Sequence, residues 1–361
     1  MAFKNFARIG SSITRKPMFN NIRNNTVGFQ KPFASKFSTN KPALSTSELI
    51  QNWSNQVLNA KTEYNEVIDG RRIAFLWDAL APHMPAGYPK FNLDPVTKEA
   101  VVGSELFPNS HLIQFWIQFK ENELSPDGYF AGEAPPPPFV QRVWAGGSLN
   151  FNVKNPLKVG QKAKLVSEID KIEEKHRNPE AGGPLILVGM KREVHNESGL
   201  TLVERRNLAY MEKMNPSRKI IKPKNSPGFS HSLTPTEITL FRYSALTWNS
   251  HRIHYDNIYS TSIEKHPSIL VHGPLTSTLL LELLRCKMPE GYSVENFSYR
   301  AVSPLYVSQE LTICGKWTSN GSSEDGSKPQ ADGSPLVCEL WALNNEGGVS
   351  MSGKATLVKT A

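Results

Sequence analysis

The residues best suited to chemistry are three histidines that fall within a short stretch, at positions 251, 254 and 272. An imidazole titrates near neutral pH, so it can take a proton from a substrate and return it. Asn249 lies just before the first two histidines and adds an amide group. Gly273 follows the third and precedes a predicted helix, so its N–H would be free to donate to an oxyanion. This combination predicts proton transfer next to a carbonyl group.

Other kinds of active site find little support. His251 and His254 could share one helical turn, as metal ligands do, but no third ligand is evident and no metal is expected. The three cysteines form neither a CxxC pair nor a disulfide framework. The chain also lacks a GxSxG elbow, a Walker loop and a GxGxxG fingerprint. We therefore expect no cofactor.

The elements that must position these residues follow from periodicity and from turn signals. The first half begins with a helix over 45–61, which Ser45 and Glu48 can cap. A short helix is expected at 110–120, after a stretch at 62–110 that has no clear assignment, and four strands follow at 140–151, 162–175, 185–196 and 200–211. In the second half we expect a strand at 232–238 and helical segments at 239–262 and 269–286. Four further strands are expected at 293–302, 310–318, 337–345 and 348–358.

Each half thus contains helical segments and an antiparallel meander, which indicates an α+β fold with two sheets, each wrapped round a helix and joined edge to edge. The expected organisation is a tail at 1–40, a first domain at 41–212, a linker at 213–230 and a second domain at 231–361. Only the second domain carries the histidine cluster. Exposed edge strands would still leave room for a homodimer.

The tail accounts for most of the charge of the chain. The net charge is +8, and residues 1–40 contain seven basic and no acidic residues, which leaves +1 on the remainder. A nearly neutral body argues against nucleic-acid binding. An acid-free tail rich in basic and hydroxyl residues is typical of a mitochondrial transit peptide, with a basic arm that stays attached as the alternative. We expect a protein of the mitochondrial matrix, and no apolar run is long enough for a membrane span.

The histidine cluster also resembles a known family motif. Asn249-x-His251-x-x-His254-x-Asp256 is similar to Asp-x-Asn-Pro-x-His-x-Asp of the hydratase-2 (MaoC-like) enzymes, and His272-Gly273 is similar to the His-Gly pair that opens their central helix. Segments of the first half resemble fungal mitochondrial 3-hydroxyacyl-thioester dehydratases; they are Val143–Gly147, Pro156–Gly160 and Val203–Tyr210. The resemblance covers about residues 110–361 and implies a double hot-dog fold.

The resemblance implies roles for the motif residues. His254 matches the catalytic acid/base, and Gly273 matches the backbone donor to the thioester oxygen. Asn249 stands where most members have an aspartate, and an amide can orient a hydroxyl or a water but cannot exchange a proton. Asp256 either orients the imidazole or caps the turn and faces solvent.

Candidate substrate-binding residues come from both halves. Trp144, Gly146 and Gly147 would line an acyl groove, with a core tryptophan and a strand bulge as the alternative. Arg252, like Arg242, would meet the phosphate of a pantetheine arm or an acidic carrier protein, or would be a paired surface charge. His272 and Asp256 complete the set of candidates.

The implied function is that of a hydro-lyase without a cofactor. The expected reaction dehydrates (3R)-3-hydroxyacyl thioesters on acyl carrier protein to trans-2-enoyl thioesters, in mitochondrial fatty-acid synthesis. One alternative is a hydratase of the enoyl-CoA or mesaconyl-CoA type that acts on CoA thioesters. The other is a non-catalytic hot-dog module that binds acyl chains.

Overall fold

A computed structural model describes the chain from Ser45 to Thr360, apart from residues 131, 178–182 and 213–219. Residues 44–361 cluster into one compact unit. The predicted transit peptide at 1–40 lies outside the described residues, as does part of the predicted linker.

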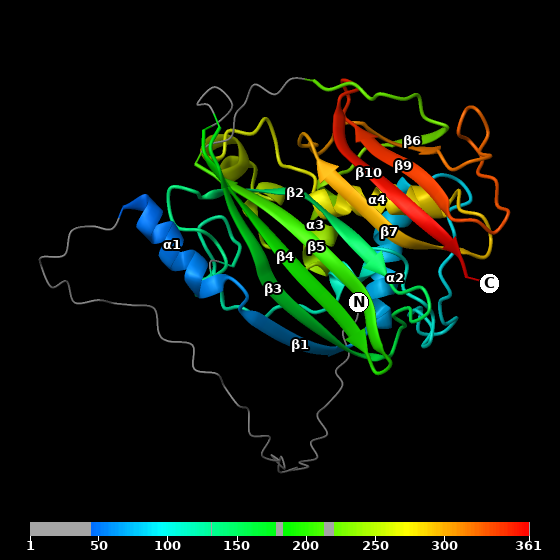
Figure 1. The fold of residues 1–361 in the computed structure, drawn as a ribbon, viewed down its shortest axis with the longest axis horizontal. Coiled ribbons are helices and arrows are strands. Elements are labelled where there is room, and N and C mark those ends of the chain that lie inside the picture. Colours follow the sequence, from blue (N-terminus) through cyan, green and yellow to red (C-terminus); the bar gives the residue numbers. More distant parts are fainter. Residues whose placement is uncertain (1–44, 131, 178–182, 213–219, 361) are drawn as a thin grey trace, which may run out of the picture. The chain divides into compact units, whose positions relative to one another are not determined.

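Ten strands form one antiparallel sheet in the order β1-β3-β4-β5-β2-β7-β10-β9-β8-β6 (Figure 1). The strands of the first half are β1 (Lys61–Val67), β2 (Gln141–Phe151), β3 (Lys162–Lys175), β4 (Leu185–Asn196) and β5 (Gly199–Met211). Those of the second half are β6 (Phe229–Leu233), β7 (Tyr292–Ala301), β8 (Leu311–Trp317), β9 (Leu336–Leu343) and β10 (Val349–Lys359). Both halves use the same internal order, and β2 pairs with β7 at the centre. This is the expected double hot-dog arrangement.

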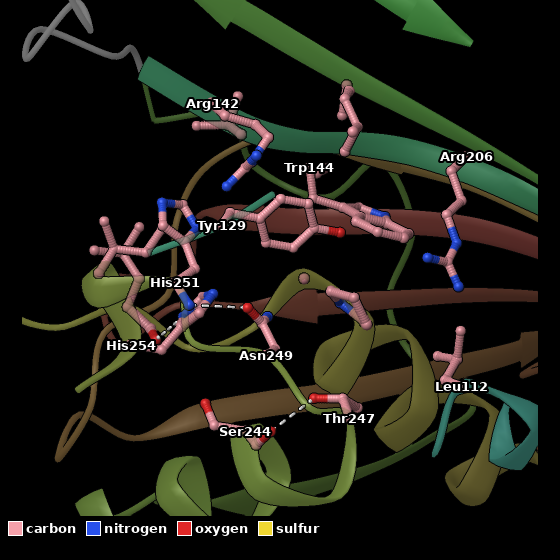
Figure 2. A pocket seen from close by; sticks show the side chains of 18 of the residues that line it. Leu112, Tyr129, Arg142, Trp144, Arg206, Ser244, Thr247, Asn249, His251 and His254 are labelled. Carbon is pink, nitrogen blue, oxygen red and sulfur yellow. Dashed lines mark hydrogen bonds between the residues drawn. The ribbon is translucent and has the colours of Figure 1, made fainter. Parts of the chain in front are cut away.

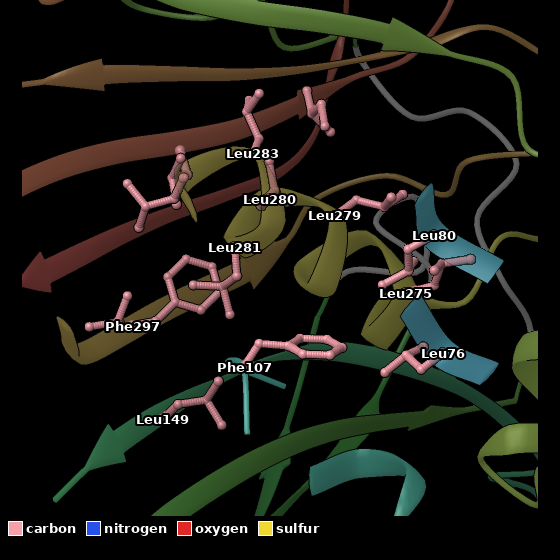
Figure 3. Close-up of a cluster of buried hydrophobic side chains, with 14 of the residues drawn as sticks. Leu76, Leu80, Phe107, Leu149, Leu275, Leu279, Leu280, Leu281, Leu283 and Phe297 are labelled. Atoms are coloured by element: carbon pink, nitrogen blue, oxygen red, sulfur yellow. The ribbon is translucent and has the colours of Figure 1, made fainter. Parts of the chain in front are cut away.

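The core of the second half is built on α4 (Gly273–Arg285), which lies behind the sheet in Figure 1. Every residue from Leu275 to Leu284 is buried, as expected of a helix surrounded by protein. Its leucines pack against Phe297 of β7 and Phe107 of the first half (Figure 3). The buried hydroxyl of Ser277 donates to the Pro274 carbonyl at 2.8 Å, so burying it leaves no unpaired donor.

In its described residues, the first half has no helix as long as α4 between its first two strands. It has α2 (Gly70–Leu80) and three short 3₁₀ turns, at Ala81–His83, Ser110–Ile113 and Glu121–Glu123. The helix expected at 110–120 is therefore wrong. Gln114 is extended and Phe115 has a φ of +57°, which ends any helix after one turn.

The other expectations hold with local differences. The capping box of Ser45 and Glu48 is present and begins α1 (Thr46–Val57). The eight strands expected at 140–211 and 293–358 match the observed ones within two residues. The strand expected at 232–238 is wrong by several residues, because β6 ends at Leu233. The helical segment expected at 239–262 is broken: α3 (Glu237–Leu246) stops before Trp248, whose φ is +51°.

Candidate active site

One cavity of about 1410 Å³ is lined by residues of both halves. The first half contributes β2, β4, β5 and the segment before β2. The second half contributes the loop after α3, the start of α4 and part of β7 (Figure 2). His254, Asn249 and Gly273, which were predicted to do the chemistry, all line this cavity.

His254 is held in a defined protonation state. It ends a 3₁₀ turn (Arg252–His254), and its Nδ1 lies 2.8 Å from the Leu270 carbonyl oxygen. A carbonyl can only accept, so Nδ1 carries the proton and Nε2 keeps its lone pair. Burial lowers the pKa of His254 to about 4, against the raising effect of that hydrogen bond. The imidazole is therefore neutral at pH 7 and can act as a base.

His272 supports this ring from behind. The two imidazoles are stacked with their centroids 3.7 Å apart, and His272 Nε2 lies 2.8 Å from Ser244 Oγ. His272 is fully buried and does not line the cavity, although it was a candidate for substrate binding. Its position is that of a residue that fixes the His254 ring and the beginning of α4.

Asn249 presents its amide N–H groups to the cavity. Its Oδ1 accepts a hydrogen bond from the backbone N–H of His251 at 3.0 Å (Figure 2), and its backbone N–H donates to the Ser244 carbonyl at 2.9 Å. Oδ1 thus has one of its two lone pairs engaged, and the NH₂ group is the donor that Asn249 can offer to a substrate. Asn249 can therefore donate to a substrate hydroxyl.

Gly273 is the first residue of α4, so no carbonyl within the helix accepts its N–H. Pro274 has no N–H to offer, so the Gly273 N–H is the first donor at this helix end. A Cβ on Gly273 would come within 2.9 Å of Cβ of Trp144. Trp144 itself lines the cavity, and its Nε1 donates to the Tyr299 hydroxyl at 3.1 Å. The tryptophan of the first half thus closes directly over the helix start of the second.

A group that the sequence did not reveal lies beside His254. Asp127 accepts from Arg142 Nη2 at 2.8 Å, and its Oδ2 is 3.4 Å from Nε2 of His251. Burial and the positive charge of Arg142 hold the pKa of His251 well below its usual value. No spacing rule could have found this group, because Asp127 comes from a loop of the first half.

The remaining candidates lie away from the cavity wall. Gly146 has a φ of +140° at a β-bulge, and a Cβ there would overlap the Tyr299 carbonyl. Gly147 likewise allows the close approach of the Arg205 carbonyl. The expectation that both glycines line the groove is therefore not met, because they serve strand packing.

Arg252 and Asp256 also do not line the cavity. They pair with each other at 2.7 Å, and Asp256 accepts the Tyr259 backbone N–H at 2.9 Å. Of the alternatives left open, the structure shows the paired surface charge for Arg252 and the turn cap for Asp256.

Within the described residues, no group of three or more His, Cys, Asp or Glu side chains is arranged to hold a metal ion. In the same part of the chain, no helix is both long and apolar enough to cross a membrane.

The chain is similar to known proteins over most of its length. The family model described as hydroxyacyl-thioester dehydratase type 2 matches residues 109–307, more than half of the chain. A mesaconyl-C(4)-CoA hydratase of Chloroflexus aurantiacus is 32% identical over 59% of this chain and 76% of its own length. A mitochondrial hydroxyacyl-thioester dehydratase type 2 of Schizosaccharomyces pombe is 29% identical over 73% of this chain and 92% of its own.

Solved structures agree on the fold. A MaoC-like dehydratase from Phytophthora capsici superposes with a TM-score of 0.56, at 12% identity, over 88% of this chain and all of that one. A conserved hypothetical protein of Mycobacterium tuberculosis with a double hotdog fold gives a TM-score of 0.52 at 11% identity, over 85% of this chain and 98% of that one.

Proposed function

Because the chain belongs to the hydroxyacyl-thioester dehydratase type 2 family of hydro-lyases, we propose that it dehydrates (3R)-3-hydroxyacyl thioesters to trans-2-enoyl thioesters. The proposed substrates are carried on acyl carrier protein, in mitochondrial fatty-acid synthesis. The observation that carries the proposal is His254: its Nδ1 is engaged by Leu270, its Nε2 is free to act as a base, and it shares a cavity with Asn249 and Gly273.

The reaction breaks a C–H bond at C2 and a C–O bond at C3, forms a C=C bond and releases water. In the proposed mechanism, Nε2 of His254 takes the C2 proton. The negative charge moves to the thioester oxygen, where the Gly273 N–H and the helix dipole of α4 stabilise it. The imidazolium then returns the proton to the departing 3-hydroxyl, to which the Asn249 amide donates.

Burial gives His254 a dual role in this scheme. The low pKa keeps the imidazole neutral before reaction, so the base is always available at pH 7. It also makes the imidazolium a strong acid, which favours transfer of the proton to a poor leaving group such as hydroxide.

A CoA thioester is the second candidate substrate. It is favoured by the similarity to the mesaconyl-C(4)-CoA hydratase, which aligns over three quarters of that enzyme. The same three groups would then add water to a double bond, since dehydration and hydration share one transition state.

The test is turnover of (3R)-3-hydroxyacyl thioesters on CoA and on acyl carrier protein, followed by the absorbance of the enoyl product. His254→Ala should lose at least ~100-fold in kcat, the lower end of what general acid–base catalysis supplies. His176→Ala is the matched control, because that side chain is 81% exposed. Unchanged activity of His254→Ala would refute the assignment, and turnover by neither carrier would favour the acyl-binding module.

The proposed location is the mitochondrial matrix. It is supported by the acid-free basic tail and by relatives that are named mitochondrial. A fusion of residues 1–40 to a fluorescent protein should enter the matrix, and the same fusion with its seven basic residues changed to Gln should not.

A further inference from the structure

The inner face of the first half-sheet carries charge where a core is expected. Along β5 the residues that face inward are Leu202, Glu204, Arg206 and Leu208, so two charged residues interrupt an apolar row. Arg192 of β4 lies directly opposite Glu204 in the register. Arg192 and Arg206 both line the cavity that contains His254.

The charges of this cluster do not balance. Glu204 accepts hydrogen bonds from Arg206, through Nε at 2.6 Å and Nη2 at 3.0 Å, and from Arg192 Nη1 at 3.1 Å. The third neighbour of Glu204 is His111, 3.3 Å away, and burial lowers its pKa, which favours the neutral imidazole. Two guanidinium groups thus share one carboxylate, and the cluster has an excess positive charge.

Other ionisable groups lie near this cluster. Arg142 has its own counter-ion in Asp127, so that pair is neutral. Glu133 also lines the cavity; burial raises the pKa of its carboxyl group, and the positive charges of Arg192 and Arg206 oppose that shift. Burial and the nearby Arg206 lower the pKa of Arg192 to about 10, so it still carries its charge at pH 7.

The two arginines also have hydrogen-bonding capacity to spare. Glu204 takes one nitrogen of Arg192 and two of Arg206, and a guanidinium offers more N–H donors than these. A buried cation without a full counter-charge is costly, and an anionic ligand in the cavity would remove that cost. Guanidinium groups are especially suited to carboxylate and phosphate, which they bind in a bidentate manner.

We propose that Arg192 and Arg206 form an anion subsite, which binds a charged oxygen group of the thioester substrate. The group is either a carboxylate at the far end of the acyl chain or a phosphate of the pantetheine arm. This inference rests on the proposed function, because it assumes that the substrate lies in the cavity with His254. It makes the first half a selector of charged substrates rather than a plain apolar tunnel.

Because Arg192 and Arg206 share the Glu204 carboxylate, each can be replaced while the other keeps its partner. Arg206→Gln and Arg192→Gln each leave one arginine paired with Glu204, so both proteins should fold. Arg205→Gln is the control, because Arg205 lies on the opposite face of β5, is half exposed and pairs with Asp170. Circular dichroism and thermal melting should be alike in the three variants.

The substrates are trans-2-enoyl-CoA thioesters of four to ten carbons, each with a methyl or a carboxylate end, and their N-acetylcysteamine analogues, which lack phosphate. If the carboxylate is the ligand, wild type prefers the carboxylate series at one chain length. Arg206→Gln and Arg192→Gln then lower kcat/KM for that series by about tenfold or more, while Arg205→Gln does not. If the phosphate is the ligand, the loss appears with every CoA thioester and vanishes with the N-acetylcysteamine series.

The subsite would be overturned if Arg192→Gln and Arg206→Gln lowered kcat/KM equally for every substrate, with CoA and with N-acetylcysteamine alike. It would also be overturned if neither variant lowered kcat/KM. In that outcome the methyl-ended thioesters are still turned over, so the proposed function survives. Absence of turnover with every thioester would instead reject the proposed function, and the two failures are therefore distinct.

Discussion

The pH at which activity fails tests the role given to His254. Burial lowers the pKa of this imidazole from 6.5 to about 4, and the base must be neutral to accept the C2 proton. At pH 5 a group with a pKa of 4 is about 90% neutral, whereas one with a pKa of 6.5 is only about 3% neutral. Wild-type kcat/KM should therefore stay nearly constant from pH 7 to pH 5 and fall tenfold per unit well below pH 4.

The assay follows enoyl thioester formation in a series of buffers at constant ionic strength, with near-ultraviolet circular dichroism at each pH to show that the protein is folded. Thioester substrates are stable in acid, so the lower limit is set by the enzyme. If kcat/KM instead falls with a midpoint near pH 6.5 while the protein is still folded, the base is an ordinary exposed imidazole. The reasoning from burial would then be refuted.

Further predictions concern the other site groups and the core. Gly273→Ala should lower kcat/KM by about 100-fold, because the new Cβ meets Trp144 and displaces either that side chain or the start of α4. The double variant Gly273→Ala, Trp144→Ala should recover part of the loss, whereas a fully active Gly273→Ala protein would contradict the close packing. Asn249→Ala should lower kcat about ten- to a hundredfold with little change in melting temperature, since it removes a donor to the substrate; a purely structural effect would instead lower the melting temperature. Leu281→Ala should cost ~2–5 kcal/mol in the free energy of urea unfolding, and Ile238→Ala, 67% exposed, less than ~0.5 kcal/mol. The free energy of unfolding should fall as the pH drops from about 6.5 towards 4, because His254 is protonated at a higher pH in the unfolded chain than in the native protein. This group alone contributes up to about 3 kcal/mol to that change, and a urea midpoint that stays constant over this pH range would contradict its burial.

Local features were predictable because they depend on neighbours in the sequence. The strands of the two meanders alternate in polarity with a period of two, and the observed bounds follow that pattern. The Ser45 capping box is satisfied within four residues. The proposed acid/base, amide and oxyanion donor all come from positions 249–273, so their proximity needs only a turn and a helix start.

The predictions that went wrong depend on distant contacts. The helix expected at 110–120 has an apolar sequence that suits a helix, but after one turn its residues instead join the buried core and line the cavity. Gly146 and Gly147 were assigned to the groove from their type, whereas strand packing against β7 and β5 decides their position. Arg192 and Glu204 were detectable in principle, as charged residues at inward positions of predicted strands.

Sequence patterns alone were enough to predict the two antiparallel meanders, the buried helix α4 and the short motif that contains His254 and Gly273. Long-range packing brings Asp127 and Arg142 to His251, places Trp144 over the start of α4, and puts two arginines on Glu204 at the cavity wall. The physical reason is that hydrogen-bonding patterns and side-chain periodicity act over a few residues. The cavity is lined by residues of both half-sheets, which the pairing of β2 with β7 brings together, and no local pattern encodes that pairing.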